Sequence, residues 1–389
     1  MKKKNKNKQI SIRLFLASSV GLFLLLACGK TVAENKVDES VPAEFDAMDS
    51  DFEYQFVAES EDGYYFWEHM GEDQYYPRLM FLDKVSDRVV PLCNKPDCMH
   101  DTKECNAYFP NLNFGEDGID KHYLQYYEGS LYAVGVSSDN YVTLFRIAAD
   151  GSEWEISTAL YRADYADTGH WRTLDILIDN GYVYYVDTKQ KKMKLERMPI
   201  GGGTAEVLFE EEDGAEVEIY RMECHENNNR VFFQAKIFLD ESAEHTVGGL
   251  YQYNEENGCC DLIKGSLSSP YTVLNGEVYY GNTEGLCRYS IQDGITEVLD
   301  DQPMDVPNIT LTEDYIILCN HMVDGSLLIY DYEGNQIATV SDDMKPIWYF
   351  GGSSEMLFSE CVSDNRVKLC YLDLTRPLDE LEWKELKVD

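Results

Sequence analysis

The chain has 389 residues, of which 71 are acidic and 33 basic, so its formal net charge is −38 at pH 7. So acidic a chain is unsuited to nucleic acid, or to anionic lipid bound through charge, because both ligands are themselves negative. The charge favours solubility and a weak attraction for cations, but no acidic run has the spacing of a calcium-binding EF-hand loop.

Residues 1–27 have the pattern of a secretory signal peptide. Five lysines and Arg13 make the start basic, and residues 14–27 are an almost uninterrupted apolar run that is short for a membrane span. Residues 25–29 read Leu-Leu-Ala-Cys-Gly, which resembles the lipobox of bacterial lipoproteins. That resemblance implies cleavage before Cys28 and attachment of acyl chains such as palmitate to this cysteine. Two or three such chains anchor a protein stably in a membrane.

A lipid on Cys28 predicts where the protein lies. Residues 28–50 are polar, acidic and poor in aromatic residues, which is typical of a flexible tether. Residues 51–389 would then be a folded domain at the extracytoplasmic face of a bacterial cell membrane, on the cell surface, with the membrane as a partner through the lipid. Without the signal peptide, 27 basic and 71 acidic residues remain, a net charge of −44.

A cysteine-rich insertion at residues 91–108 follows the first β-unit. It contains Cys93, Cys98, His100 and Cys105, which have the pattern Cys-x4-Cys-x-His-x4-Cys. Three thiolates and one imidazole are a ligand set that suits tetrahedral zinc. A structural zinc ion would stabilise a segment that is too short to have a hydrophobic core of its own.

Two other states of the three cysteines remain open. Outside the cytoplasm, oxidation could join two of them and leave the third to pair elsewhere, or all three could be free, redox-active thiols. A similar Leu-Cys-x4-Cys-x-His-x4-Cys segment occurs in propeller-like surface lipoproteins of Gram-positive bacteria, which this chain resembles over most of its mature length. That group has no assigned activity, so the resemblance implies a fold and a location but no ligand.

One structural unit recurs along the rest of the chain. It is clearest in residues 271–299, which read as four short β-runs with an Asn275-Gly276 turn between the first two. The second run of the unit is recognisable at seven places, which begin at Gly63, Gly129, Gly181, Asn229, Gly276, Asp314 and Ser354. The recurrence is the main signal for the fold.

Repeats of about 40–50 residues with four strands each predict an all-β fold of the β-propeller type. Seven blades of about four antiparallel strands are the leading interpretation, with six or eight as the neighbouring ones. Residues 52–56 alternate apolar and polar side chains and are expected to pair with the last unit. The repeat resembles WD40-like and TolB-like propellers in architecture, without their recurring Trp-Asp. A series of β-sandwich domains is disfavoured by the even spacing and by the lack of Pro/Ser-rich linkers.

Three further cysteines, Cys287, Cys319 and Cys370, lie in apolar strand runs. We interpret them as small buried hydrophobic residues. Cys259 and Cys260 are adjacent, and a disulfide between them would be strained.

No catalytic motif of the serine hydrolase, zinc protease, dinucleotide-binding or phosphate-loop type occurs in the chain. The sequence therefore favours a lipid-anchored propeller that binds a protein, peptide or glycan ligand over an enzyme. One alternative is a cell-surface enzyme that acts on glycans with loop carboxylates as acid and base. Another is a metal- or redox-responsive sensor or assembly factor that uses the cysteine stretch.

Overall fold

The computed structural model describes residues 57–68, 78–102, 104–109, 118–137, 139–162, 176–187, 193–211, 216–224, 230–239, 246–267, 269–306, 308–319, 326–340, 346–352, 355–363 and 366–387. Residues 51–389 form one compact unit, and residues 1–50 are a separate unit outside the described part. The expected signal peptide, Cys28 and the acidic tether therefore lie outside the described residues. Within these, no helix has the length and apolar character needed to cross a membrane.

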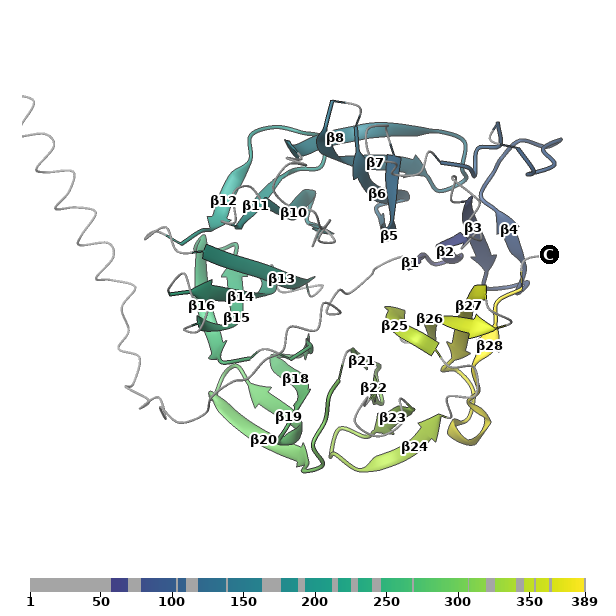
Figure 1. The fold of residues 1–389 in the computed structure, drawn as a ribbon. Helices are drawn as coiled ribbons and strands as arrows, with labels where there is room; N and C mark the ends of the chain where they lie inside the picture. The colour runs from purple at the N-terminus through teal and green to yellow at the C-terminus, as the bar shows by residue number, and fades with distance from the viewer. Residues whose placement is uncertain are drawn as a thin grey trace, which may run out of the picture. The chain divides into compact units, whose positions relative to one another are not determined.

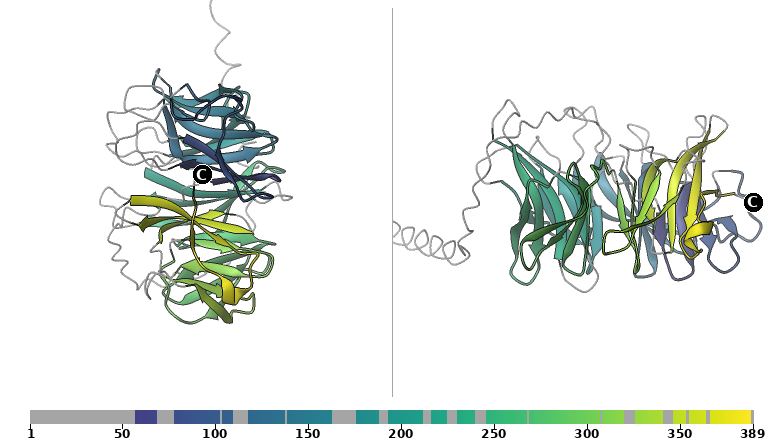
Figure 2. Two further views of the ribbon diagram at one scale, coloured as in Figure 1. Left: turned by 90° about the vertical axis from the view of Figure 1, so that its right-hand side faces the viewer. Right: turned by 90° about the horizontal axis from the view of Figure 1, so that it is seen from below.

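The described strands form seven sheets of four antiparallel strands, and the strand order in every sheet follows the chain. Figure 1 shows the sheets arranged as blades around a common axis, with first strands such as β1, β5, β21 and β25 toward the centre. Seen from the side, the strands run between the two faces of the ring (Figure 2). The fold is the seven-bladed β-propeller that the repeat predicts.

Blades 1 to 4 use the first sixteen strands. Blade 1 contains β1 (Val57–Glu59), β2 (Gly63–Glu68), β3 (Arg78–Asp83) and β4 (Val89–Pro91). Blade 2 contains β5 (Gly118–Tyr127), β6 (Ser130–Val136), β7 (Tyr141–Ala148) and β8 (Trp154–Arg162). Blade 3 contains β9 (Ile176–Asp179), β10 (Tyr182–Asp187), β11 (Lys194–Pro199) and β12 (Glu206–Phe209). Blade 4 contains β13 (Glu216–Cys224), β14 (Arg230–Phe238), β15 (Thr246–Asn254) and β16 (Cys259–Gly265).

Blades 5 to 7 use the remaining twelve strands. Blade 5 contains β17 (Tyr271–Leu274), β18 (Glu277–Asn282), β19 (Gly285–Ser290) and β20 (Ile295–Asp300). Blade 6 contains β21 (Ile309–Leu311), β22 (Ile316–Cys319), β23 (Leu327–Tyr330) and β24 (Gln336–Val340). Blade 7 contains β25 (Pro346–Gly352), β26 (Met356–Ser363), β27 (Arg366–Asp373) and β28 (Lys384–Glu385), with a short 3-10 helix η2 (Leu378–Glu380) before the last strand.

The hairpin between β17 and β18 shows why these residues fold as they do. Asn275 and Gly276 have φ angles of 52° and 82°, and Leu274 pairs with Glu277 across them. Two consecutive positive φ angles make the two-residue turn whose twist matches that of the strands it joins. The same pair of positive φ angles recurs at the first hairpin of two other blades, Glu128–Gly129 and Asn180–Gly181. The predicted Asn-Gly hairpin is confirmed.

The hydrophobic core lies between the blades. One buried cluster joins Phe232 and Leu250 of blade 4 to Val278 of blade 5, and another joins Trp67 of blade 1 to Phe358 of blade 7. Because most sheets contact a neighbour on each side, strands such as β6 are buried at every position instead of alternating. A single blade could not bury both faces, which is why the fold needs the ring.

The abundant tyrosines lie largely in these interfaces. Tyr330, on blade 6, is 1% exposed, and its hydroxyl donates to Asp300 of blade 5 at 2.8 Å. Burial, together with this carboxylate, raises the pKa of Tyr330. A tyrosine can bury its ring in a core and still use its hydroxyl at the edge, so packing accounts for its frequency here.

The seam between blades 7 and 1 closes the ring. Blade 7 takes all four of its described strands from residues 346–385, so it includes no described strand from the start of the chain. The expected pairing of residues 52–56 with this blade lies outside the described residues. Across the seam the rings of Tyr64 and Phe358 are 5.2 Å apart, and Lys84 forms an ion pair with Glu355 at 3.2 Å.

Candidate metal centre

The four predicted ligands lie on the segment that connects blade 1 to blade 2. We call residues 92–109 the cysteine loop; Lys103 is outside the described residues. Two tight turns shape it, because the Cys98 N–H donates to the Lys95 carbonyl at 3.3 Å and the Cys105 N–H to the Thr102 carbonyl at 3.0 Å. The turns fold the loop back on itself and bring the cysteines together.

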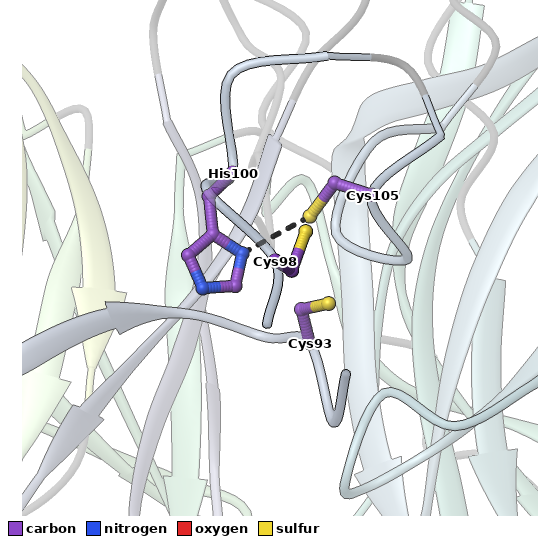
Figure 3. Close-up of side chains that lie close together, drawn as sticks. All are labelled: Cys93, Cys98, His100 and Cys105. Carbon is purple, nitrogen blue, oxygen red and sulfur yellow. Dashed lines mark hydrogen bonds between the residues drawn. The ribbon is translucent and has the colours of Figure 1, made fainter. Parts of the chain in front are cut away.

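The ligand atoms of Cys93, Cys98, His100 and Cys105 all lie within 4.8 Å of one another. Figure 3 shows the three sulfurs and the imidazole grouped together, and Nδ1 of His100 lies 3.3 Å from Sγ of Cys105. Cys105 is buried, and the other three are half-buried. The structure therefore brings together all four residues of the predicted set, from a stretch of thirteen residues.

The thiols of this cluster differ in their surroundings. Burial works against ionisation of Cys93, but the backbone N–H groups of Lys95 and Asn106 donate to its sulfur and lower its pKa below the ordinary value. Burial dominates at Cys105 and raises its pKa to about 12, although the Ala107 N–H donates to its sulfur at 3.4 Å. Amide donors that point at sulfur stabilise a thiolate, which is the form that binds metal.

His100 is held in place through its backbone. It has a φ of 55°, a left-handed conformation that is uncommon outside glycine. Its carbonyl accepts hydrogen bonds from Nη1 of Arg78 at 3.1 Å and from the hydroxyl of Tyr108 at 3.2 Å. Two donors on one carbonyl fix the turn, and the turn directs the imidazole toward Cys105.

Arg78 connects the cluster to blade 1. It lies at the start of β3, and its Nε forms an ion pair with Glu68 at the end of β2 at 2.5 Å. Burial opposes the charge of Arg78, but the hydrogen bond with Glu68 keeps its pKa above the ordinary value. The guanidinium lies near enough to Cys105 to interact with it electrostatically. A fixed positive charge beside a cluster of thiolates favours their ionised state.

The redox state of the cysteines differs along the chain. Cys93, Cys98, Cys105, Cys260 and Cys287 form no disulfide. Cys370 is disulfide-bonded. Cys287 is fully buried and forms no disulfide, as predicted. Cys370 is completely buried in β27, as predicted, but it is not a simple hydrophobic residue, because an apolar strand pattern buries a bridged sulfur as well as a free one. The side chain of Cys319 lies outside the described part.

Sequence reasoning missed the residues that support the ligands. Arg78 lies 22 positions before His100, in a strand, and no spacing rule connects the two. Asn106 had a weak signal, since it directly follows a ligand and has a side chain that can donate two hydrogen bonds. Tyr108 had none, because tyrosines are common throughout the chain.

Comparison with known proteins supports the fold and gives no family. No protein-family model matches the chain, and no curated protein matches its sequence. Among solved structures, a prolyl endopeptidase aligns with 86% of this chain, with a TM-score of 0.56 and 9% sequence identity. The alignment covers 50% of the endopeptidase chain. A puromycin hydrolase aligns with 85% of this chain, with a TM-score of 0.57 and 11% sequence identity, and the alignment covers 53% of the hydrolase chain. A puromycin-hydrolysing peptidase of Mycobacterium tuberculosis aligns with 87% of this chain, with a TM-score of 0.55 and 12% sequence identity, and the alignment covers 55% of the peptidase chain.

This chain thus corresponds to about half the length of the peptidases it resembles. At such low identity the likeness shows a shared β-propeller fold and nothing about the reaction.

Proposed function

We propose that this protein is a lipid-anchored, extracytoplasmic β-propeller that acts as a binding module, and that Cys93, Cys98, His100 and Cys105 hold a structural zinc ion. The observation that carries the proposal is the convergence of four ligand atoms from three cysteines and one histidine. Sulfurs bound to one zinc at about 2.3 Å in tetrahedral geometry lie about 3.8 Å apart. A spread of up to 4.8 Å needs only small side-chain rotations to reach that geometry.

Three thiolates and one imidazole fill a tetrahedral shell. A catalytic zinc keeps one position for water or substrate, whereas a structural zinc has four protein ligands. The charge of the site also suits zinc, since three thiolates with one divalent ion leave one negative charge beside the Arg78 guanidinium. Zinc is therefore assigned a structural role, and ligand binding is assigned to the surfaces of the propeller.

The location follows from residues 25–29 and Cys28, through their resemblance to a lipobox. A tether of about twenty polar residues would hold the propeller near the membrane, free to meet a protein, peptide or glycan. Propellers present loops of several blades on one face, which suits binding of an extended or branched ligand.

The metal assignment is tested by metal analysis of the full-length protein in detergent. We expect about one zinc per chain, lost in Cys98→Ser and retained in Cys259→Ser, which changes a cysteine on β16 of blade 4, outside the cluster. Protein purified with no zinc would overturn it, whether two of the three cysteines are then joined in a disulfide or all three are free thiols.

Anchoring is tested by growth with labelled palmitate. The label and retention in the membrane fraction should both disappear in Cys28→Ala and persist in Cys259→Ala. The binding role is tested with arrays of peptides and cell-wall glycans probed with the same full-length protein. Saturable binding without turnover is expected, and release of cleaved glycan would favour the enzyme alternative instead.

A further inference from the structure

The cysteine loop is fastened to blade 1 by its backbone. The Leu79 N–H donates to the Ala107 carbonyl and the Leu92 N–H donates to the Leu79 carbonyl, both at 2.8 Å. Tyr108 forms an isolated antiparallel bridge with Arg78. These contacts extend the outer part of blade 1 by one irregular segment, residues 107–108, which follows the ligand Cys105 closely in the chain.

The same loop also contacts blade 2. Nδ2 of Asn106 donates to the carbonyls of Gly151 at 2.9 Å and Ser152 at 3.2 Å, in the turn that joins β7 to β8. A Cβ atom on Gly151 would lie 2.3 Å from the Leu92 carbonyl oxygen, so the loop backbone lies directly against this turn. Gly151 also has a φ of 68°, which suits the absence of a side chain.

Phe109, at the end of the loop, packs between the two blades. Its ring lies 5.4 Å from that of Trp67 in blade 1, edge to face, and 5.9 Å from that of Trp154 in blade 2. Trp67 and Phe109 are almost completely buried, whereas Trp154 is 43% exposed. Aromatic contacts of this kind add to the polar contacts of Asn106 on the same blade interface.

Asn106 also links these contacts to the metal ligands. Its backbone N–H donates to the sulfur of Cys93, and it directly follows Cys105 in the chain. Its side chain meanwhile contacts the turn of blade 2. A metal that fixes Cys93 and Cys105 would therefore also fix the orientation of Asn106 toward Gly151.

We propose that the metal centre is an interblade clasp: binding of zinc by Cys93, Cys98, His100 and Cys105 and docking of Asn106 and Phe109 on blade 2 stabilise each other. The inference rests on the proposed zinc site and adds a role to it. Coupling of this kind is reciprocal, so weaker docking lowers metal affinity and loss of metal weakens docking. The position of the loop also suits this role, because the loop lies on the segment of chain that connects blade 1 to blade 2.

The test is hydrogen exchange of the full-length protein in detergent, as purified and after removal of zinc by a chelator, with zinc content measured on each sample. The reporters on blade 2 are the amides of Ala148 and Gly151, which donate to Glu153 and Ala148 within the β7–β8 turn. We expect exchange about tenfold faster at these amides and in residues 92–109 once zinc is removed. Blade 5, on another part of the ring, should exchange at an unchanged rate.

Asn106→Ala separates docking from ligation, because it leaves all four ligands in place. It should bind zinc about tenfold more weakly, as for other residues that orient ligands, and exchange faster at Ala148 and Gly151 even with zinc bound. Thr102→Ala is the matched control. Thr102 lies in the same loop, and its side chain is exposed to solvent. It should leave both quantities unchanged.

The outcomes distinguish the two proposals. If the purified protein holds no zinc, the proposed metal site fails and the clasp fails with it. If zinc is present, but its removal speeds exchange only in residues 92–109 and not in the β7–β8 turn, the site stands and the clasp is overturned. Unchanged zinc affinity in Asn106→Ala would overturn the clasp as well.

Discussion

The cysteine loop and blade 5 lie in one ring but are stabilised differently. Blade 5 is made of four short strands, and a two-residue turn joins the first two of them. The blade buries Val278, Tyr280 and Leu286 against neighbouring blades. The described residues of the cysteine loop form no regular strand, and residues 94–97 are exposed to solvent. Its order depends on hydrogen bonds to Arg78, Tyr108 and Asn106, and on four residues that can share a metal. A segment without a core of its own needs such bonds to compensate for the entropy lost on ordering it.

The contrast predicts that the two regions respond to different perturbations. Removal of the metal should disorder the loop and leave blade 5 intact, whereas a cavity in blade 5 should destabilise the ring and leave zinc binding intact. The experiments below test this separation, from the largest expected effect to the smallest.

Cys98→Ser should abolish stable metal binding and open the cysteine loop. A protease that cuts after acidic residues should then cleave at Glu104 at least about tenfold faster than in the zinc-containing protein, since local opening exposes the backbone. Cleavage products identified by mass give the site. Cys259→Ser is the control, and equal cleavage rates in the two variants would show that the loop is ordered without metal.

Leu286→Ala should destabilise the propeller by about 2–5 kcal/mol, the usual cost of a large cavity in a core. Leu286 is completely buried between blades 5 and 6, so the cavity has little means of collapsing. Urea unfolding followed by fluorescence measures the loss. Zinc content under native conditions should stay at the level of the unmodified protein, and its loss would show that the two regions are not independent.

Arg78→Lys should weaken zinc binding about ten- to hundredfold, the range found for residues that orient metal ligands. Lysine keeps the positive charge but cannot donate to both Glu68 and the His100 carbonyl through a planar fork. Competition with a chelator of known affinity measures the change. Arg376→Lys, which alters a partly exposed ion pair with Asp373 on blade 7, should leave zinc affinity unchanged.

Gly276→Ala should destabilise blade 5 by about 1 kcal/mol, because an L-residue is disfavoured at a φ of 82°. No atom lies within 4 Å of the added Cβ, so the effect is one of backbone conformation alone. Gly265→Ala is the matched control, since that position is equally open and has no positive φ. A loss of equal size in both variants would contradict the explanation.

Much of the fold could be predicted from short stretches of sequence. Each of the seven recurring runs lies at the second strand of a blade, from β2 near Gly63 to β26 near Ser354. The turns at Asn180–Gly181 and Asn275–Gly276 fall where the dipeptides indicate them. Strand period and turn conformation are set by a few neighbouring residues, so they can be read without knowledge of the rest of the chain.

The metal ligands could be predicted for the same reason, since all four lie within thirteen residues and two tight turns suffice to bring them together. The sequence by itself determined the repeat, the architecture and this ligand set. The tertiary structure decided which distant residues support the site. Arg78, at the start of β3, donates to the His100 carbonyl, and the Gly151 carbonyl on the next blade accepts from Asn106. It also decided that Cys370 is bridged while Cys287 is not. Such contacts depend on how the blades pack around the ring, and no local pattern records that packing.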